Sequence, residues 1–177
     1  MEGAGKFILP LALIAAFLLW VYVYIPYEVK SDAKAIKKDG AKDSLLRKWH
    51  ITSAVKTGIL GAAVSAPFLF FSYLIPIAVF IGLLSLFWLL FDRGLNRARG
   101  LSDEYVGKTA DIDAWFQEHF HDPKYPDYKT LRGFLRFKYW FLYRFASSPY
   151  DAMINLKTFC LMTSAAFLII ALLDFYF

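Results

Sequence analysis

The most constraining feature of this sequence is a run of thirty-five consecutive residues, 57–91, without a charged side chain. A straight helix of that length would measure about 52 Å, whereas the hydrocarbon core of a bilayer is about 30 Å thick. The chain therefore has to turn back, and Pro76 marks the turn because proline disfavours helix at the preceding residue and suits the first turn of a new one. The run predicts a transmembrane hairpin over residues 51–95, with spans 51–71 and 76–95. A pair of shorter re-entrant helices is the alternative.

Two further apolar segments raise the expected number of spans to about four. Residues 7–25 are uncharged, and aromatic side chains gather at their end, as at membrane interfaces. We expect an uncleaved transmembrane anchor over 1–27, because no small-x-small cleavage pattern follows. The last segment, 152–177, is preceded by Ser-Pro-Tyr-Asp, in which Ser148 is the expected N-cap and proline the first helical residue. The chain is thus predicted to be an all-α integral membrane protein, in keeping with a hydrophobic fraction of 58%.

Basic residues are concentrated between the spans. Residues 28–50 hold seven and residues 92–151 hold ten, whereas the N-terminal tail holds one and the C-terminal tail none. The positive-inside rule therefore predicts that both polar segments are cytoplasmic and both termini outside. We expect a basic, partly helical connector over 28–50 and a helical cytoplasmic or interfacial segment over 96–151.

Polar residues close the predicted hairpin at one membrane boundary. His50 precedes the second span and Asp92 follows the third, so antiparallel spans would bring them to the same depth. Asp92 and Asn96 share a helix face at i, i+4 spacing. We predict a structural polar clasp of His50, Asp92 and Asn96, because charged groups at a membrane edge are usually paired. In the fourth span, Asn155 and Lys157 are expected to face water or headgroups.

The segment between the third and fourth spans offers two candidate recognition surfaces. One stretch mixes aromatic and basic side chains, which makes it too charged to span the membrane and too apolar to be fully solvated. It is expected to lie among anionic headgroups. The alternative is an ordinary amphipathic helix that packs against the protein's own spans. This lipid-headgroup surface comprises Arg132, Arg136, Lys138, Trp140, Tyr143 and Arg144. A short helix expected over about 110–121 offers Asp111, Asp113 and Trp115 to a protein partner.

Metal, redox and nucleic-acid chemistry have weak support in the sequence. His119 and His121 form an H-x-H pair without an evident third ligand. Cys160 is the only cysteine, so neither an intrachain disulfide nor a thiolate cage can form. The 20 basic and 15 acidic residues are interspersed, unlike a nucleic-acid-binding arm. The middles of the predicted spans lack ionisable residues, which argues against an ion transporter. We expect no cofactor, no metal and no nucleic-acid partner.

Residues 94–113, GLNRARGLSDEYVGKTADID, echo a known signature at Gly94, Ala98, Arg99, Gly107 and Asp111. The pattern resembles that of the CDP-alcohol phosphatidyltransferases, membrane enzymes that bind two metal ions and a CDP-lipid. Arg93 precedes the first glycine in place of an aspartate, and Asp113 follows Asp111 by two residues instead of four. Because i and i+2 do not share a helix face, these two acids cannot hold one metal from a regular helix. A metal-dependent lipid headgroup transferase is therefore the least favoured reading.

A second pattern runs from a Trp-His at the start of the second span to an Asp before aromatics. It comprises Trp49, His50, Asp92, Asn96, Arg99, Gly100, Tyr105, Gly107, Thr109, Ala110, Asp113 and Phe116. Over residues 47–116 it resembles a set of small uncharacterised polytopic membrane proteins encoded by phages and prophages of the Bacteroidota. The resemblance implies a phage-linked membrane protein and no assigned activity.

These patterns together favour a non-enzymatic structural or interaction protein of a membrane. We expect a phage-encoded component of the host inner membrane or of a lipid-containing virion. Its partners would be a bilayer with anionic headgroups and other membrane proteins or a second copy of the chain. One alternative is an accessory subunit of a large membrane complex, such as a respiratory assembly in a bacterial or organelle inner membrane. Another is a holin-like pore former.

Overall fold

The protein is all-α and carries four helices that are long and apolar enough to cross a membrane. A computed structural model describes residues 2–39, 43–103, 105, 146 and 148–176, with side chains from 7 to 37 and from 51 onward within these ranges. The four candidate spans in the described part are Phe7–Lys37, Ile51–Phe70, Leu74–Ala98 and Pro149–Tyr176. The predicted fold class is therefore confirmed. The predicted interfacial segment lies largely outside the described residues.

The first span is one continuous rod in three parts. It begins with α1 (Glu2–Leu19), passes through the π-helical turn η1 (Trp20–Tyr24) and continues as α2 (Ile25–Asp39). The rod therefore extends into the segment that its charges marked as a connector. The 31 residues of this candidate span measure roughly 46 Å, more than a hydrocarbon core of about 30 Å requires. The α2 end of the rod is thus long enough to reach the headgroup layer.

The predicted hairpin is formed by α3 (Asp43–Ser65), the 3₁₀ helix η2 (Ala66–Phe70) and α4 (Leu74–Ala98). The chain reverses over residues 71–73, where the Phe71 amide donates to the Phe68 carbonyl at 3.1 Å. Pro76 lies in the first turn of α4, as expected. Because both arms are long enough to span, the structure favours the hairpin over re-entrant helices.

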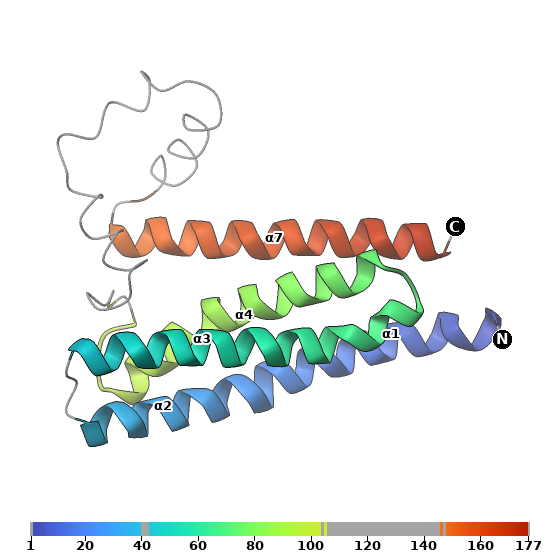
Figure 1. Cartoon of the computed structure of the whole chain (residues 1–177). Helices are drawn as coiled ribbons and strands as arrows, with labels where there is room; N and C mark the ends of the chain where they lie inside the picture. The colour runs from blue at the N-terminus through green and yellow to red at the C-terminus, as the bar shows by residue number, and fades with distance from the viewer. Residues whose placement is uncertain (1, 40–42, 104, 106–145, 147, 177) are drawn as a thin grey trace.

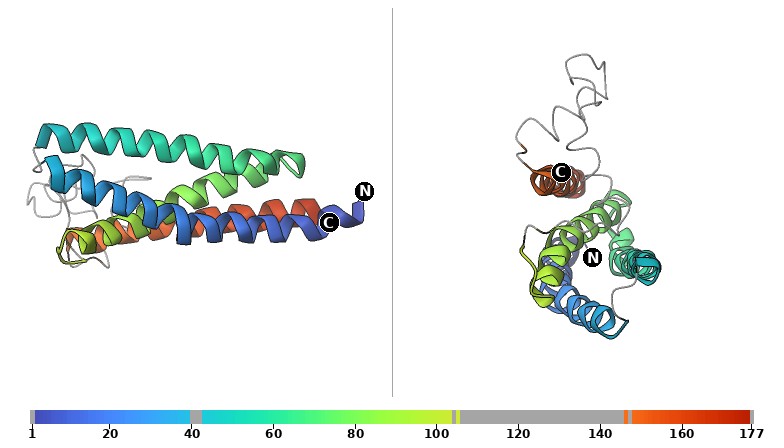
Figure 2. Two further views of the ribbon diagram at one scale, coloured as in Figure 1. Left: turned by 90° about the horizontal axis from the view of Figure 1, so that it is seen from below. Right: turned by 90° about the vertical axis from the view of Figure 1, so that its left-hand side faces the viewer.

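Helix α4 is the centre of the bundle. It contacts α2, α3 and, most extensively, α7 (Pro149–Tyr176). Figure 1 shows α7 running alongside α4, and the end-on view of Figure 2 places α7 to one side of the other helices. The start of α1 and the end of α7 lie at the same end of the bundle (Figures 1 and 2). This is the arrangement expected if all four helices cross one membrane, because an even number of crossings returns the chain to the side on which it began.

Small residues allow α4 to approach its neighbours closely, as is common between transmembrane helices. The Ser164 hydroxyl of α7 donates to the Ala78 carbonyl of α4 at 2.8 Å. A Cβ added at Gly82 would lie 2.8 Å from that hydroxyl oxygen, and one added at Gly94 would lie 2.9 Å from a methyl of Val29 in α2. These two glycines therefore set how near α7 and α2 can come to α4.

Aromatic rings join the η1 turn to α4. The Trp20 ring nitrogen donates to the Leu83 carbonyl at 2.8 Å, which satisfies the indole N–H inside the bundle. The Trp20 and Tyr24 ring centroids lie 4.4 Å apart, and those of Tyr24 and Phe87 lie 5.8 Å apart. This contact fixes the first span beside the hairpin.

Candidate functional site at the polar end of the bundle

The polar side chains that bridge the spans gather mainly toward one end of the bundle. At this end α2 and α4 finish, and α3 and α7 begin (Figure 1). Two networks are present among the described residues. One joins α2 to α3 and is called here the α2–α3 ladder; the other joins α4 to α7 and to the residues after α4, and is called the α4–α7 junction.

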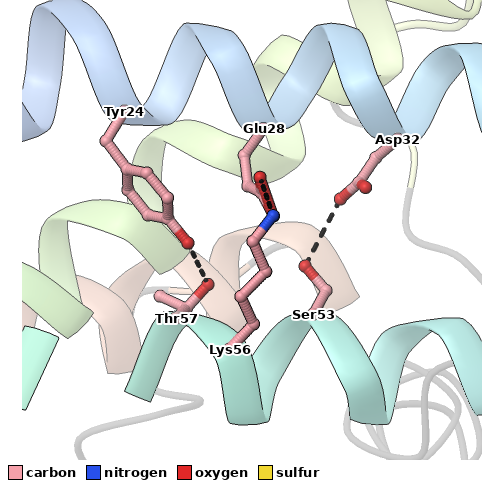
Figure 3. Close-up of polar contacts among 6 residues, drawn as sticks. All are labelled: Tyr24, Glu28, Asp32, Ser53, Lys56 and Thr57. Atoms are coloured by element: carbon pink, nitrogen blue, oxygen red, sulfur yellow. Dashed lines mark hydrogen bonds and ion pairs between the residues drawn. The ribbon is translucent and has the colours of Figure 1, made fainter. Parts of the chain in front are cut away.

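The α2–α3 ladder follows one face of the first rod. Tyr24, Glu28 and Asp32 recur at i, i+4 and i+8, which places them in line on a helix. The Tyr24 hydroxyl oxygen lies 2.9 Å from that of Thr57 in α3. The Lys56 ammonium donates to both carboxylate oxygens of Glu28, at 2.6 and 2.7 Å. The Ser53 hydroxyl donates to Asp32 at 3.3 Å. Figure 3 shows the three rungs crossing between the two helices. The ladder therefore fixes both the distance and the register between α2 and α3.

The middle rung of the ladder is an asymmetric ion pair. The Glu28 side chain is 2% exposed, whereas that of Lys56 is 52% exposed. A buried carboxylate is tolerated when it is paired and hydrogen-bonded, and both Glu28 oxygens accept from the ammonium. The ammonium also lies 5.8 Å from the Tyr27 ring centroid. Lys56 thus extends its apolar stem along the helices and keeps part of its length at the surface.

The α4–α7 junction contains the most deeply buried charge among the described residues. The Lys157 side chain is 0% exposed, and its ammonium donates to Asp92, whose side chain is 31% exposed. The ammonium also lies 5.1 Å from the Trp88 ring centroid, within cation–π range. The expectation that Lys157 faces water or headgroups is wrong. The early turns of α7 pack against α4, and pairing with Asp92 offsets the loss of hydration.

Further contacts hold the chain on both sides of residues 106–145. Arg93 Nε donates to the Tyr150 hydroxyl at 2.8 Å, with the guanidinium 5.9 Å from the ring centroid. Asn96, which is buried, donates from its side-chain amide to the Tyr105 carbonyl at 2.8 Å. The Ser148 hydroxyl accepts from the Asp151 amide at 3.1 Å and confirms the predicted N-cap. The end of α4 and the start of α7 are thereby tied together.

An exposed ion pair closes the turn after α4. The Arg97 guanidinium donates to both oxygens of Asp103, with Nε distances of 2.7 and 3.0 Å. These hydrogen bonds lower the pKa of Asp103 from its usual value, because they favour the charged carboxylate. Gly100 adopts a φ of 73°, the left-handed conformation that glycine accepts without strain. The chain is therefore turned and held as it leaves the helix.

The structure accounts for part of the predicted sites. Asp92 and Asn96 are both engaged, with partners from α7 and from the chain after α4. The His50 side chain lies outside the described residues, so the three-residue clasp stays a prediction. The lipid-headgroup surface and the protein-partner candidates all fall within residues 106–145, which also lie outside the described residues. They too remain predictions.

Sequence reasoning missed the ladder and the burial of Lys157. The four-residue spacing of Tyr24, Glu28 and Asp32 was a usable signal, because it indicates one continuous helix face crossing the end of the apolar segment. The spacing was overlooked because the charged residues from 28 onward predicted a polar connector at the same positions. In the described part of the chain, no group of three or more His, Cys, Asp or Glu side chains could hold a metal ion.

Comparison of the chain with protein-family models, curated proteins and solved structures finds no match.

Proposed function

We propose that the protein is a non-enzymatic membrane interaction protein, whose helix bundle presents residues 106–145 to a partner at the membrane surface. The observation that carries this proposal is the α4–α7 junction. The chain enters this segment from the end of α4 and returns at the start of α7, and the two points are joined by Asp92 with Lys157 and by Arg93 with Tyr150. The segment between them therefore leaves the bundle and returns to it at one place.

Tied ends favour recognition for an entropic reason. Ordering a segment when it binds a partner costs conformational entropy. When the bundle already holds both ends of the segment, part of that entropy is lost during folding, and less is lost on binding. The positive-inside rule predicts that this segment is cytoplasmic. Its predicted surfaces, basic and aromatic in one stretch and acidic in another, suit anionic headgroups and a protein partner respectively.

The resemblance to phage-encoded proteins supports a phage-linked role. Three of the residues that carry it, Asp92, Asn96 and Tyr105, take part in the junction, two through their side chains and one through its carbonyl. The proposal is thus a component of an infected cell's membrane or of a lipid-containing virion. An accessory subunit of a cellular membrane complex could present the segment in the same way. The identity of the partner distinguishes this role from the phage-linked one.

The test is affinity purification of the full tagged chain from its native cells, with lysine cross-linking and mass spectrometry. We expect a partner in fixed stoichiometry, cross-linked within residues 96–151. Virion proteins would support the phage-linked role, and respiratory subunits would support the accessory role. Recovery of the chain alone, or dye release from cells that express it, would contradict the proposal.

A pair of tyrosine variants links the partner to the junction. Tyr150→Phe removes the hydroxyl that Arg93 contacts, and we expect it to lower partner recovery severalfold. Tyr73→Phe makes the same chemical change in an exposed residue at the hairpin turn, at the opposite end of the bundle, and should leave recovery unchanged. Equal recovery with both variants would count against a role for the junction.

A further inference from the structure

An apolar groove lies between the first rod and α3, beneath the α2–α3 ladder. It has a volume of about 400 Å³, within the range of roughly 300–1,000 Å³ for small-molecule sites. Its lining residues are Ala16, Leu19, Trp20, Val23, Tyr24, Tyr27, Leu60 and Val64. Several of them lie on the outer surface of the bundle, with Leu19 at 61% and Val23 at 58% exposed. Because both belong to the first candidate span, the groove would open toward lipid in a bilayer.

The wall of the groove is apolar, because the polar atoms of Trp20 and Tyr24 are already hydrogen-bonded within the bundle. The Trp20 ring nitrogen donates to the Leu83 carbonyl, and the Tyr24 hydroxyl bonds Thr57. Apart from the Tyr27 hydroxyl at one end, the lining residues offer hydrocarbon, so a polar ligand would gain few hydrogen bonds along this wall and would lose its hydration. Hydrocarbon loses nothing there, so the chemistry of the wall selects an acyl chain.

One end of the groove opens onto cations. Tyr27 lies at this end, with the Lys56 ammonium 5.8 Å from its ring centroid. Lys30 and Lys34 follow Tyr27 at i+3 and i+7, on the same helix face, and both are exposed. They lie roughly 35 and 40 Å along the rod from Phe7, which is at and just beyond a headgroup layer that extends about 5–7 Å past a hydrocarbon core of about 30 Å. Their long side chains reach back to the phosphates of that layer.

The acidic side chains of this region are turned away from the groove end. Glu28 and Asp32 are both buried, and they contact Lys56 and Ser53 of α3. The lysines therefore face the membrane surface while the carboxylates face the bundle. The resulting surface is apolar at acyl depth and positive at headgroup depth, which complements an anionic phospholipid.

We propose that this groove binds an anionic phospholipid, with one acyl chain along Trp20, Val23 and Leu60 and the phosphate at Lys30 and Lys34, beside Lys56, whose charge is paired with Glu28. The site is separate from the predicted surface in residues 106–145 and does not depend on the proposed function. Since bulk lipid tails are as apolar as the groove, selectivity comes from the cations. Each lysine near an anionic headgroup contributes about a fivefold preference.

The test is photo-cross-linking of the full chain in nanodiscs with a phospholipid that carries a diazirine on its acyl chain. Phosphatidylglycerol and phosphatidylcholine versions differ only in the headgroup, and mass spectrometry locates the adducts. We expect phosphatidylglycerol to label peptides containing Leu60 and Val64 at least fivefold more than phosphatidylcholine does. Unlabelled phosphatidylglycerol should compete better than unlabelled phosphatidylcholine on the unaltered protein, which needs no variant.

Matched variants separate the headgroup contacts from the groove. Lys34→Gln should reduce the preference about fivefold, whereas Arg99→Gln removes the same charge from an exposed residue after α4 and should change nothing. Val23→Trp should fill the groove and reduce labelling by both lipids. Val55→Trp, at a residue of α3 that is 56% exposed and does not line the groove, should not.

Three results would overturn the proposal. These are equal labelling by the two lipids, equal effects of Lys34→Gln and Arg99→Gln, or equal effects of Val23→Trp and Val55→Trp. Any of them would mean that the groove holds ordinary surrounding lipid without selection.

Discussion

Removing one partner of the Asp92–Lys157 pair should have very different consequences depending on which partner is removed. In Asp92→Asn, the Lys157 ammonium stays 0% exposed and, within the described part of the chain, is left with the Trp88 ring and a neutral amide. Breaking a buried pair in this way costs about 3–5 kcal/mol. In Lys157→Met, the Asp92 carboxylate is 31% exposed and can be hydrated. Its loss of a partner should cost about 1–3 kcal/mol.

The difference of about 2 kcal/mol corresponds to roughly thirtyfold in the unfolding equilibrium. Reversible unfolding in mixed micelles, followed by helical circular dichroism during titration with sodium dodecyl sulfate, measures it. The double variant D92N/K157M should be more stable than D92N alone, because no charge is then left buried. Asp174→Asn, at an exposed carboxylate near the other end of α7, is the control and should shift stability by less than about 0.5 kcal/mol.

Two outcomes would refute this reasoning. If Asp92→Asn is tolerated as well as Lys157→Met, the buried ammonium does not depend on the carboxylate. If the double variant is no more stable than Asp92→Asn, the cost does not come from an unpaired cation.

Three further predictions concern other parts of the chain. Gly82→Ala should destabilise the bundle by about 1–3 kcal/mol through overpacking, because its Cβ would lie 2.8 Å from a serine hydroxyl of α7; Gly58→Ala, with nothing within 4 Å, should be neutral or slightly stabilising in the same micelle titration. The pair of Arg97 and Asp103 should be fully formed above the ordinary aspartate pKa near 4 and lost as the pH falls through the lower folded value; a carboxyl ¹³C titration of Asp103 at the ordinary pKa would contradict this. A peptide of residues 129–150 should bind liposomes more with anionic lipid and less with salt, and indifference to both would remove the predicted lipid-headgroup surface.

Length and hydrophobicity were enough to predict the number of spans, although the first one extends to Lys37 instead of ending near residue 27. The charge-free run from 57 to 91 exceeds one crossing, and Pro76 lies in the first turn of the returning helix, just after the reversal at residues 71–73. The hairpin therefore follows from bilayer thickness and proline chemistry. The N-cap at Ser148 follows in the same way from local hydrogen bonding. These features depend on residues close together in the chain, which is why the sequence suffices for them.

The pairings between spans could not be predicted in the same way. Lys157 is 65 residues from Asp92, and only the packing of α7 against α4 brings them together. Glu28 and Asp32 carry charges that a hydropathy count assigns to solvent, although their partners on α3 allow them to be buried. A count of charges along the chain registers each group alone, whereas burial depends on the pair.

The π-helical turn η1 has a consequence for how this protein can change over time. A turn of this kind holds one residue more than an α-helical turn, with the Ile25 amide reaching back to the Trp20 carbonyl. Because this wider turn absorbs the extra residue, deleting a single residue there would restore an unbroken α-helix and leave the later residues facing nearly the same way, so Glu28 would still point toward Lys56. Deleting a residue in a regular α-helical part of the rod would instead rotate everything after it by about 100° relative to α1 and break the α2–α3 ladder. The π-helical turn is therefore a place where the first span can lose one residue while both of its halves keep their contacts.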